Sequence, residues 1–197
     1  MGEPVPAGPP RGRPRSTVVD AAILDAALEE YAQRGFDGLS VDAVAARAGV
    51  GKATIYRRYG SKLELVRDAM YLSSEQKPTP DTGSLRGDLK ALLQHLDQLV
   101  HDPTLGAGLR HMVADAIGNP ELGAVHDDFI QHRRAGSKLV LQRAIDRGEL
   151  RPDTDLELAT DLLTGPVFLR HLMTHMPVDE AFLAGVLEDF LRAYEPT

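Results

Sequence analysis

The chain has 197 residues, of which 43% are hydrophobic and 26% charged, and its formal net charge is -7. That composition is typical of a globular chain of one or two domains, and the absence of cysteine excludes disulfides, a thiolate nucleophile and cysteine-ligated zinc. No stretch approaches the roughly 20 apolar residues of a membrane-spanning helix, and the N-terminus lacks the apolar core of a secretory signal, so we expect a cytoplasmic protein without a membrane partner.

Charge is distributed unevenly along the chain. Residues 1–60 hold eight Lys/Arg against seven Asp/Glu, whereas residues 61–197 hold fourteen against twenty-two. Within the first block, most acids lie between Asp20 and Asp42, which leaves two separate basic clusters. A polyanion is therefore expected to bind the N-terminal part of the chain.

The first 15 residues are predicted to form a disordered basic arm. Residues 1–14 include five prolines and three glycines, a composition that cannot bury enough apolar surface to fold. The arm carries Arg11, Arg13 and Arg15 in the sequence RGRPR, which suits the minor groove of A·T-rich DNA. A tail that serves only solubility explains the same residues equally well.

Four helices are predicted before a break at residues 77–83. The first begins after Ser16 or Thr17 and ends at Gly35, and the second follows Ser40 as N-cap and ends at Gly49. The third covers about 51–59 and the fourth 61–76. We assign residues 16–60 to one N-terminal domain of three helices and residues 61–76 to a connecting helix.

Residues 84–197 are predicted to form a second, helical domain, because every long segment there has apolar residues at helical spacing and none alternates as a strand does. The expected fold is all-α, with about nine helices in total. The last segment, 180–194, is apolar on two adjoining faces, which is wider than one core contact requires. We therefore expect a homodimer that pairs through the last two helices, about 156–175 and 180–194, with Leu183, Leu187, Phe190 and Leu191 in the interface.

The sequence GVGKATIYRRYGSK, residues 49–62, contains four cations and no acid. Together with the preceding helix it predicts a helix-turn-helix from about Ser40 to Tyr59. At helical spacing Ile55 and Tyr59 share one face, while Arg57 points away from it. A polar front of this kind is able to enter the DNA major groove. A solvated cationic face on a packing helix is the plainer alternative.

The stretch AARAGVGKATIYRRYGSKLELV resembles the DNA-binding region of TetR-family transcriptional regulators. The resemblance implies that Lys52 and Thr54 reach base edges and that Tyr56 and Arg58 contact the DNA backbone. It also implies that the N-terminus of the fourth helix, with Lys62, and the start of the second helix approach phosphate. The full set of predicted DNA-binding residues is Ser40, Val41, Lys52, Thr54, Tyr56, Arg57, Arg58, Lys62, Arg11, Arg13 and Arg15.

The same resemblance implies a regulator, most simply a repressor that a small-molecule effector releases from palindromic double-stranded operator DNA. The effector is expected between residues 85 and 175, near an interruption of a helix at Gly165–Pro166. On release, the connecting helix 61–76 is expected to shift. The candidate effector-binding residues are His95, His111, Met112, Phe129 and Met173.

Other classes of function stay open at this stage. His171 and His175 are spaced as two metal ligands on one helix face, which would suit a helical metal-dependent enzyme, but no third ligand or catalytic motif accompanies them. We predict no catalytic residue, no metal site and no cofactor. A non-enzymatic interaction module and an activator without an effector are the remaining alternatives.

Overall fold

The computed structural model describes residues 17–75 and 78–196, and the predicted basic arm with Arg11, Arg13 and Arg15 lies outside the described residues. Within this part, the chain forms nine α-helices and one π-helical segment, without a strand, so the expected all-α fold is confirmed. The helices are α1 (Thr17–Gly38), α2 (Val41–Ala48), α3 (Lys52–Tyr59), α4 (Lys62–Glu75), α5 (Leu85–His101), α6 (Pro103–Gly118), α7 (Pro120–Asp146), α8 (Leu156–Phe168) and α9 (Glu180–Tyr194), with the π-helix η1 (Leu169–Thr174) after α8.

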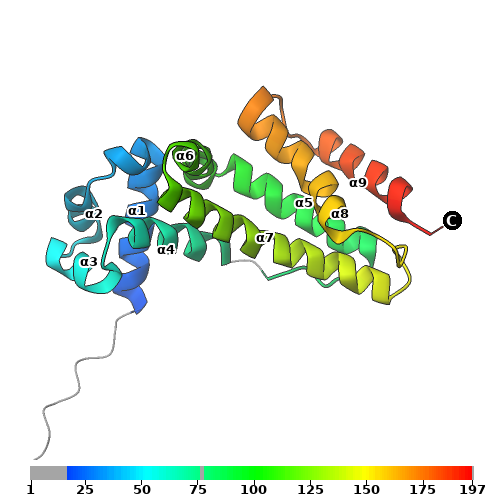
Figure 1. Ribbon diagram of the computed structural model, residues 1–197, viewed down its shortest axis with the longest axis horizontal. Helices are drawn as coiled ribbons and strands as arrows, with labels where there is room; N and C mark the ends of the chain where they lie inside the picture. Colours follow the sequence, from blue (N-terminus) through cyan, green and yellow to red (C-terminus); the bar gives the residue numbers. More distant parts are fainter. Residues whose placement is uncertain (1–16, 76–77, 197) are drawn as a thin grey trace, which may run out of the picture.

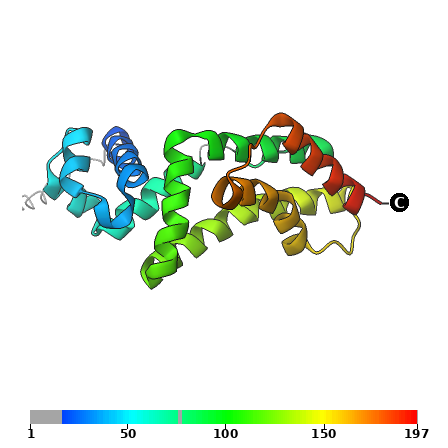
Figure 2. The same cartoon turned by 90° about the horizontal axis from the view of Figure 1, so that it is seen from above.

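The molecule is elongated, with α1 to α4 at one end and α5, α7, α8 and α9 at the other (Figure 1). Seen from above, α6 runs across the long axis between the two ends (Figure 2). Its most extensive packing is against α1 and α7. Helix α6 is therefore the element that joins the first helix to the C-terminal bundle.

The first helix ends as the sequence predicts, but with one additional turn. Gly35 adopts φ 66° and ψ -175°, which breaks the regular helix at the predicted position, and helical structure resumes as far as Gly38. A residue with a side chain would be strained at this positive φ. The last turn of α1 is consequently set at an angle to the rest of the helix.

The predicted interruption at Gly165–Pro166 is displaced in the structure. Helix α8 continues through Pro166, and the chain widens into η1 directly after Phe168. Proline lacks the amide hydrogen that would bond the carbonyl four residues earlier, so the helix is already weakened before it widens. The segment 156–176 is thus an α-helix followed by a π-helix.

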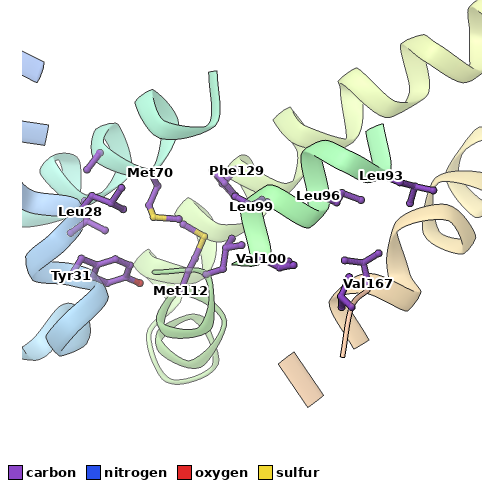
Figure 3. Packing of buried hydrophobic residues seen from close by; sticks show 14 of the residues in the cluster. Leu28, Tyr31, Met70, Leu93, Leu96, Leu99, Val100, Met112, Phe129 and Val167 are labelled. Carbon is purple, nitrogen blue, oxygen red and sulfur yellow. The ribbon is translucent and has the colours of Figure 1, made fainter. Parts of the chain in front are cut away.

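A continuous apolar core runs from the N-terminal helices into the bundle. Met70 of α4 and Met112 of α6 lie between Leu28 and Tyr31 on one side and Phe129 on the other (Figure 3). Both methionines are buried, and their flexible thioethers suit an irregular junction between helices that cross at steep angles.

Candidate DNA-binding surface and effector cavity

Local capping residues define the two helices of the predicted helix-turn-helix. The Ser40 hydroxyl accepts a hydrogen bond from the Ala43 amide at 3.3 Å, which begins α2. Gly49 ends α2 in the left-handed conformation, at φ 65°. Gly51 then precedes α3 without a side-chain cap. The turn between α2 and α3 thus depends on glycines that the sequence places at its two ends.

Helix α3 presents opposite faces to the core and to solvent. Ile55 and Tyr59 are buried, with exposed fractions of 2% and 8%, against the rest of the N-terminal helices. Lys52, Tyr56 and Arg57 are exposed, and Thr54 is half-buried. The predicted arrangement of an anchored back and a polar front is present on this helix.

The cations around α3 differ in what they contact. Lys52 pairs with Asp42 at 2.8 Å on the exposed surface, and the Lys62 ammonium donates to the Asp37 carbonyl at 3.2 Å. Arg57 makes no ion pair or hydrogen bond with any described residue. Among the predicted DNA-binding cations that the structure describes, Arg57 is therefore the one whose charge is not already engaged.

Arg58 has a different environment from the one expected. Its guanidinium pairs with Asp20 of α1, and only 15% of its side chain is exposed. Tyr59 donates to the same carboxylate at 3.3 Å, and burial together with the Asp20 charge raises the pKa of Tyr59 to about 12. Arg58 thus ties α3 to α1 in this structure, and Val41 is likewise buried at the start of α2.

The C-terminal bundle encloses a cavity of about 800 Å³. Helices α5, α6, α7 and α8 and the segment that precedes α5 supply its lining. Its walls are largely apolar, with several polar side chains among them, and its size is within the usual range for drug-sized ligands. The lining includes Leu92, His95, Leu96, Leu99, Asp102, Leu105, Leu109, Phe129, Arg133, Arg134, Ser137, Asp161 and Phe168.

The cavity contains two of the five predicted effector-binding residues, His95 and Phe129. The other three need correction. Met112 is buried in the core beside Met70, and Met173 is 73% exposed on η1. His111 lies against α1, 5.9 Å from the Tyr31 ring. Helical spacing identifies an apolar face but does not say whether that face borders a cavity, a packed junction or solvent.

Asp115 of α6 joins the bundle to the break in α1. One of its carboxylate oxygens accepts hydrogen bonds from the Tyr31 hydroxyl and from the Phe36 amide, both at 3.1 Å. Burial and the Asp115 charge raise the pKa of Tyr31 strongly. Sequence reasoning missed Asp115, because a single acid on an amphipathic helix gives no signal for a contact 84 residues away.

The last helix does not face outward as predicted. Leu187, Phe190 and Leu191 are buried inside the chain itself, with exposed fractions of 7%, 4% and 2%, and Leu183 is half-buried. Leu187, Phe190 and Leu191 thus pack against their own chain, and of the four predicted residues only Leu183 keeps an exposed part. On the other helix predicted for the interface, large apolar side chains are exposed along α8 and just after it, at Leu158, Leu162, Leu169, Met173 and Met176.

His171 and His175, which have the spacing of two metal ligands in the sequence, lie in different environments. His171 lies with its Nε2 3.2 Å from the Gly106 carbonyl oxygen, and burial lowers its pKa. His175 follows the end of η1 in the left-handed conformation. No group of three or more potential ligands suited to a metal occurs among the residues that the structure describes. In the same part of the chain, no helix has the length and apolar character that crossing a membrane requires.

Known families match both parts of the chain. The family of bacterial regulatory proteins of the tetR type matches residues 23–69, and the tetracyclin repressor-like C-terminal domain matches residues 79–190. The HTH-type transcriptional regulator YdeS of Bacillus subtilis is 32% identical over 193 residues, with 95% of each chain covered. The DNA-binding transcriptional repressor TetR of Mycobacteroides abscessus is 32% identical over 200 residues, which cover 92% of this chain and 94% of that protein.

A solved structure agrees with these matches. The TetR family transcription regulator SCO0332 superposes with a TM-score of 0.74 at 29% identity, over 90% of this chain and 99% of that one. The fold, the exposed face of α3 and these relatives define a helix-turn-helix protein that binds DNA and regulates transcription. The chain belongs to the TetR family, and the similarity gives no support to the enzyme alternative.

Proposed function

We propose that the protein is a homodimeric repressor that binds a palindromic operator in the cytoplasm through α3 and leaves it when a small molecule occupies the bundle cavity. The exposed face of α3 with its unpaired Arg57 is the observation that supports this most directly. We assign no catalytic activity to the chain. The proposed DNA-contacting residues are Ser40, Lys52, Thr54, Tyr56, Arg57 and Lys62, with Arg11, Arg13 and Arg15 of the arm.

Selection of bound duplexes from a random pool tests operator binding. Arg57→Ala should lower affinity for the selected operator and reduce the salt dependence by about one unit of slope, because one phosphate-binding cation is lost. Lys90→Ala is the matched control, since Lys90 is an exposed cation on α5. Recovery of no preferred sequence, or equal loss in both variants, would contradict the proposed site.

The apolar row on α8 and η1 supports dimerisation. Leu158, Leu162 and Leu169 are each more than half exposed, and their spacing places them along one side of the segment. A second copy of the chain would remove this row from water. Two recognition helices so paired read half-sites one DNA turn apart, about 34 to 36 Å.

A charge placed on this row should separate the subunits without unfolding them. Leu162→Asp is expected to sediment as a monomer with unchanged helical content and weakened operator binding, since only one half-site is then contacted. Leu139→Asp is the matched control, because Leu139 is a 44% exposed leucine on a different helix, α7. An intact Leu162→Asp dimer would place the interface elsewhere.

Helix α6 is the proposed route from the effector to α3. Leu105 and Leu109 line the cavity, and Asp115 on the same helix holds the break in α1. A displacement of α6 would therefore reach α1 directly. To release the protein from operator DNA, the effector must favour the protein conformation that does not bind DNA by roughly 3 to 5 kcal/mol. The expectation that helix 61–76 shifts stays a prediction beside this route.

A further inference from the structure

Among the described residues, the charged side chains that line the cavity have hydrogen-bond or ion-pair partners, with one exception. Asp102 accepts hydrogen bonds from the amides of Thr104 and Leu105, at 2.9 and 2.8 Å, at the start of α6. Arg134 pairs with both Glu157 and Asp161. Arg133, the fourth charged residue of the lining, makes no hydrogen bond or ion pair with any residue in the described part of the chain.

Arg133 is half-buried in this lining, and it remains a cation. Burial lowers its pKa, but a guanidinium starts so far above neutrality that it stays protonated. A cation that loses part of its hydration and gains no partner destabilises the protein. An anion inside the cavity would supply the missing partner.

A second polar group lies one helical turn further along α7. Ser137 is 8% exposed and lines the same cavity, and its hydroxyl has no hydrogen-bond partner among the described residues. Residues four apart are neighbours on a helix face, so the hydroxyl and the guanidinium are placed to donate to one acceptor group. Around them the lining is apolar, with Leu92, Leu96 and Leu99 from α5, Leu105 and Leu109 from α6, and Phe168 from α8.

We propose that the effector is an amphipathic monoanion, an apolar body with one carboxylate, and that Arg133 and Ser137 bind the carboxylate inside the cavity. The inference rests on the proposed function in taking this cavity as the effector site. A single charge is specified because Arg133 is the one unpaired cation of the described lining, and a second negative charge would be buried without a partner. Neutral and cationic bodies of the same shape leave Arg133 unpaired and should bind more weakly.

Two pairs of probes test this in the absence of DNA: 2-naphthoate against 2-naphthalenemethanol, and octanoate against 1-octanol, by calorimetric titration of the full chain. The naphthalene pair can also be followed by fluorescence, because the chain contains no tryptophan. We expect the carboxylate to bind about tenfold or more tightly than its alcohol in at least one pair, as a charge-assisted hydrogen bond implies. Equal affinities in both pairs, or no carboxylate binding, would overturn the proposal.

Arg133→Met should abolish the preference for the carboxylate, and Ser137→Ala should reduce it a few-fold. Lys90→Met, which removes the same charge from the exposed side of α5, should leave the preference unchanged. Retention of the preference in Arg133→Met would overturn the assignment of Arg133.

Thermal unfolding gives an independent readout. Because the ligand-free protein loses only an unpaired cation, Arg133→Met should melt at the same temperature as the unmodified protein or higher. Added 2-naphthoate or octanoate should then raise the melting temperature of the unmodified protein and not of the variant. A lower melting temperature for the ligand-free variant would show that Arg133 supports the fold, against the proposal.

The operator is kept out of these measurements so that the two proposals fail separately. Carboxylate binding through Arg133 without release of operator DNA would leave the anion site intact and refute the release mechanism. If a carboxylate and its alcohol bind equally well and both release the operator, the release mechanism stands and the anion site is refuted.

Discussion

The two ends of the molecule differ in whether their interior contains space for a ligand. The N-terminal helices pack around side chains that are nearly inaccessible, such as Ile23, Val44 and Ile55. The C-terminal bundle also has fully buried side chains, such as Leu141 and Leu163, but beside them it contains a cavity of about 800 Å³. A DNA-reading helix has to hold several side chains in one fixed geometry, whereas a sensor needs space for its ligand. The contrast predicts that equal substitutions will have unequal effects at the two ends.

Truncation of a core side chain should show the largest difference. Ile55→Ala is expected to lower the free energy of unfolding by about 2 to 5 kcal/mol, because it leaves a void in a packed core. Leu92→Ala borders existing space and should cost less than about 2 kcal/mol. Urea denaturation measures both, and equal losses would mean that the cavity is closed in solution.

Substitutions at the junction between the two ends should cause the next largest loss of unfolding free energy. Asp115→Ala leaves the Tyr31 hydroxyl and the Phe36 amide without their acceptor, which should cost about 1 to 3 kcal/mol. Asp115→Asn retains one oxygen and should cost less. Both variants should also lose part of the coupling, so that effector and operator no longer weaken each other's binding to the same extent. Unchanged coupling would remove α6 from the route.

Alkaline pH should loosen the DNA-reading end in particular. The neutral phenol of Tyr59 is favoured in the fold, since its pKa is raised from 10.0 to about 12 by burial and the Asp20 charge. Its contribution to stability is therefore complete below pH 10 and is lost as pH rises from 10 to about 12. Tyr59→Phe should flatten the fall in unfolding free energy over that range. If the unfolding free energy of the variant falls as steeply as that of the unmodified protein, ionisation of Tyr59 is not the cause of the fall.

Acidic pH should produce the smallest of these effects on stability, and the effect should occur in the C-terminal bundle. Burial lowers the pKa of His171 below its ordinary 6.5, so its contribution is present above pH 6.5 and is lost as pH falls through the lowered value. Hydrogen exchange of the α6 amides near Gly106 should accelerate over that range, and His171→Gln should not show the change. Acceleration in both proteins would assign it to another group.

Sequence reasoning was most successful where the determinants are local. Ser40, Gly49 and Gly60 delimit α2 and α3 through bonds or backbone angles within a few residues, so the helix-turn-helix was predicted almost to the residue. The anion site was not predicted, because an arginine on an amphipathic helix usually indicates a solvated face. Only the packing of α5, α6 and α8 against α7 places Arg133 in the lining of a cavity.

The orientation of whole helices was the second limit. The spacing in α9 correctly showed two apolar faces, but it could not show that Leu187 and Phe190 point into their own chain. The exposed row on α8 looks in sequence like any buried stripe. Which apolar face meets solvent depends on packing between helices, and periodicity within one helix does not carry that information.

The backbone at Gly35 has a consequence for the genetics of this regulator. A β-carbon at this position would lie 2.9 Å from His111 Nδ1, at a φ that side chains rarely adopt. Gly118, at the end of α6, has open space around it and an ordinary φ. In a saturation screen, we expect nearly every allele at codon 35 to derepress and most alleles at codon 118 to be silent. Codon 35 would then score as strongly as the codons of α3, although its residue contacts neither the operator nor the effector.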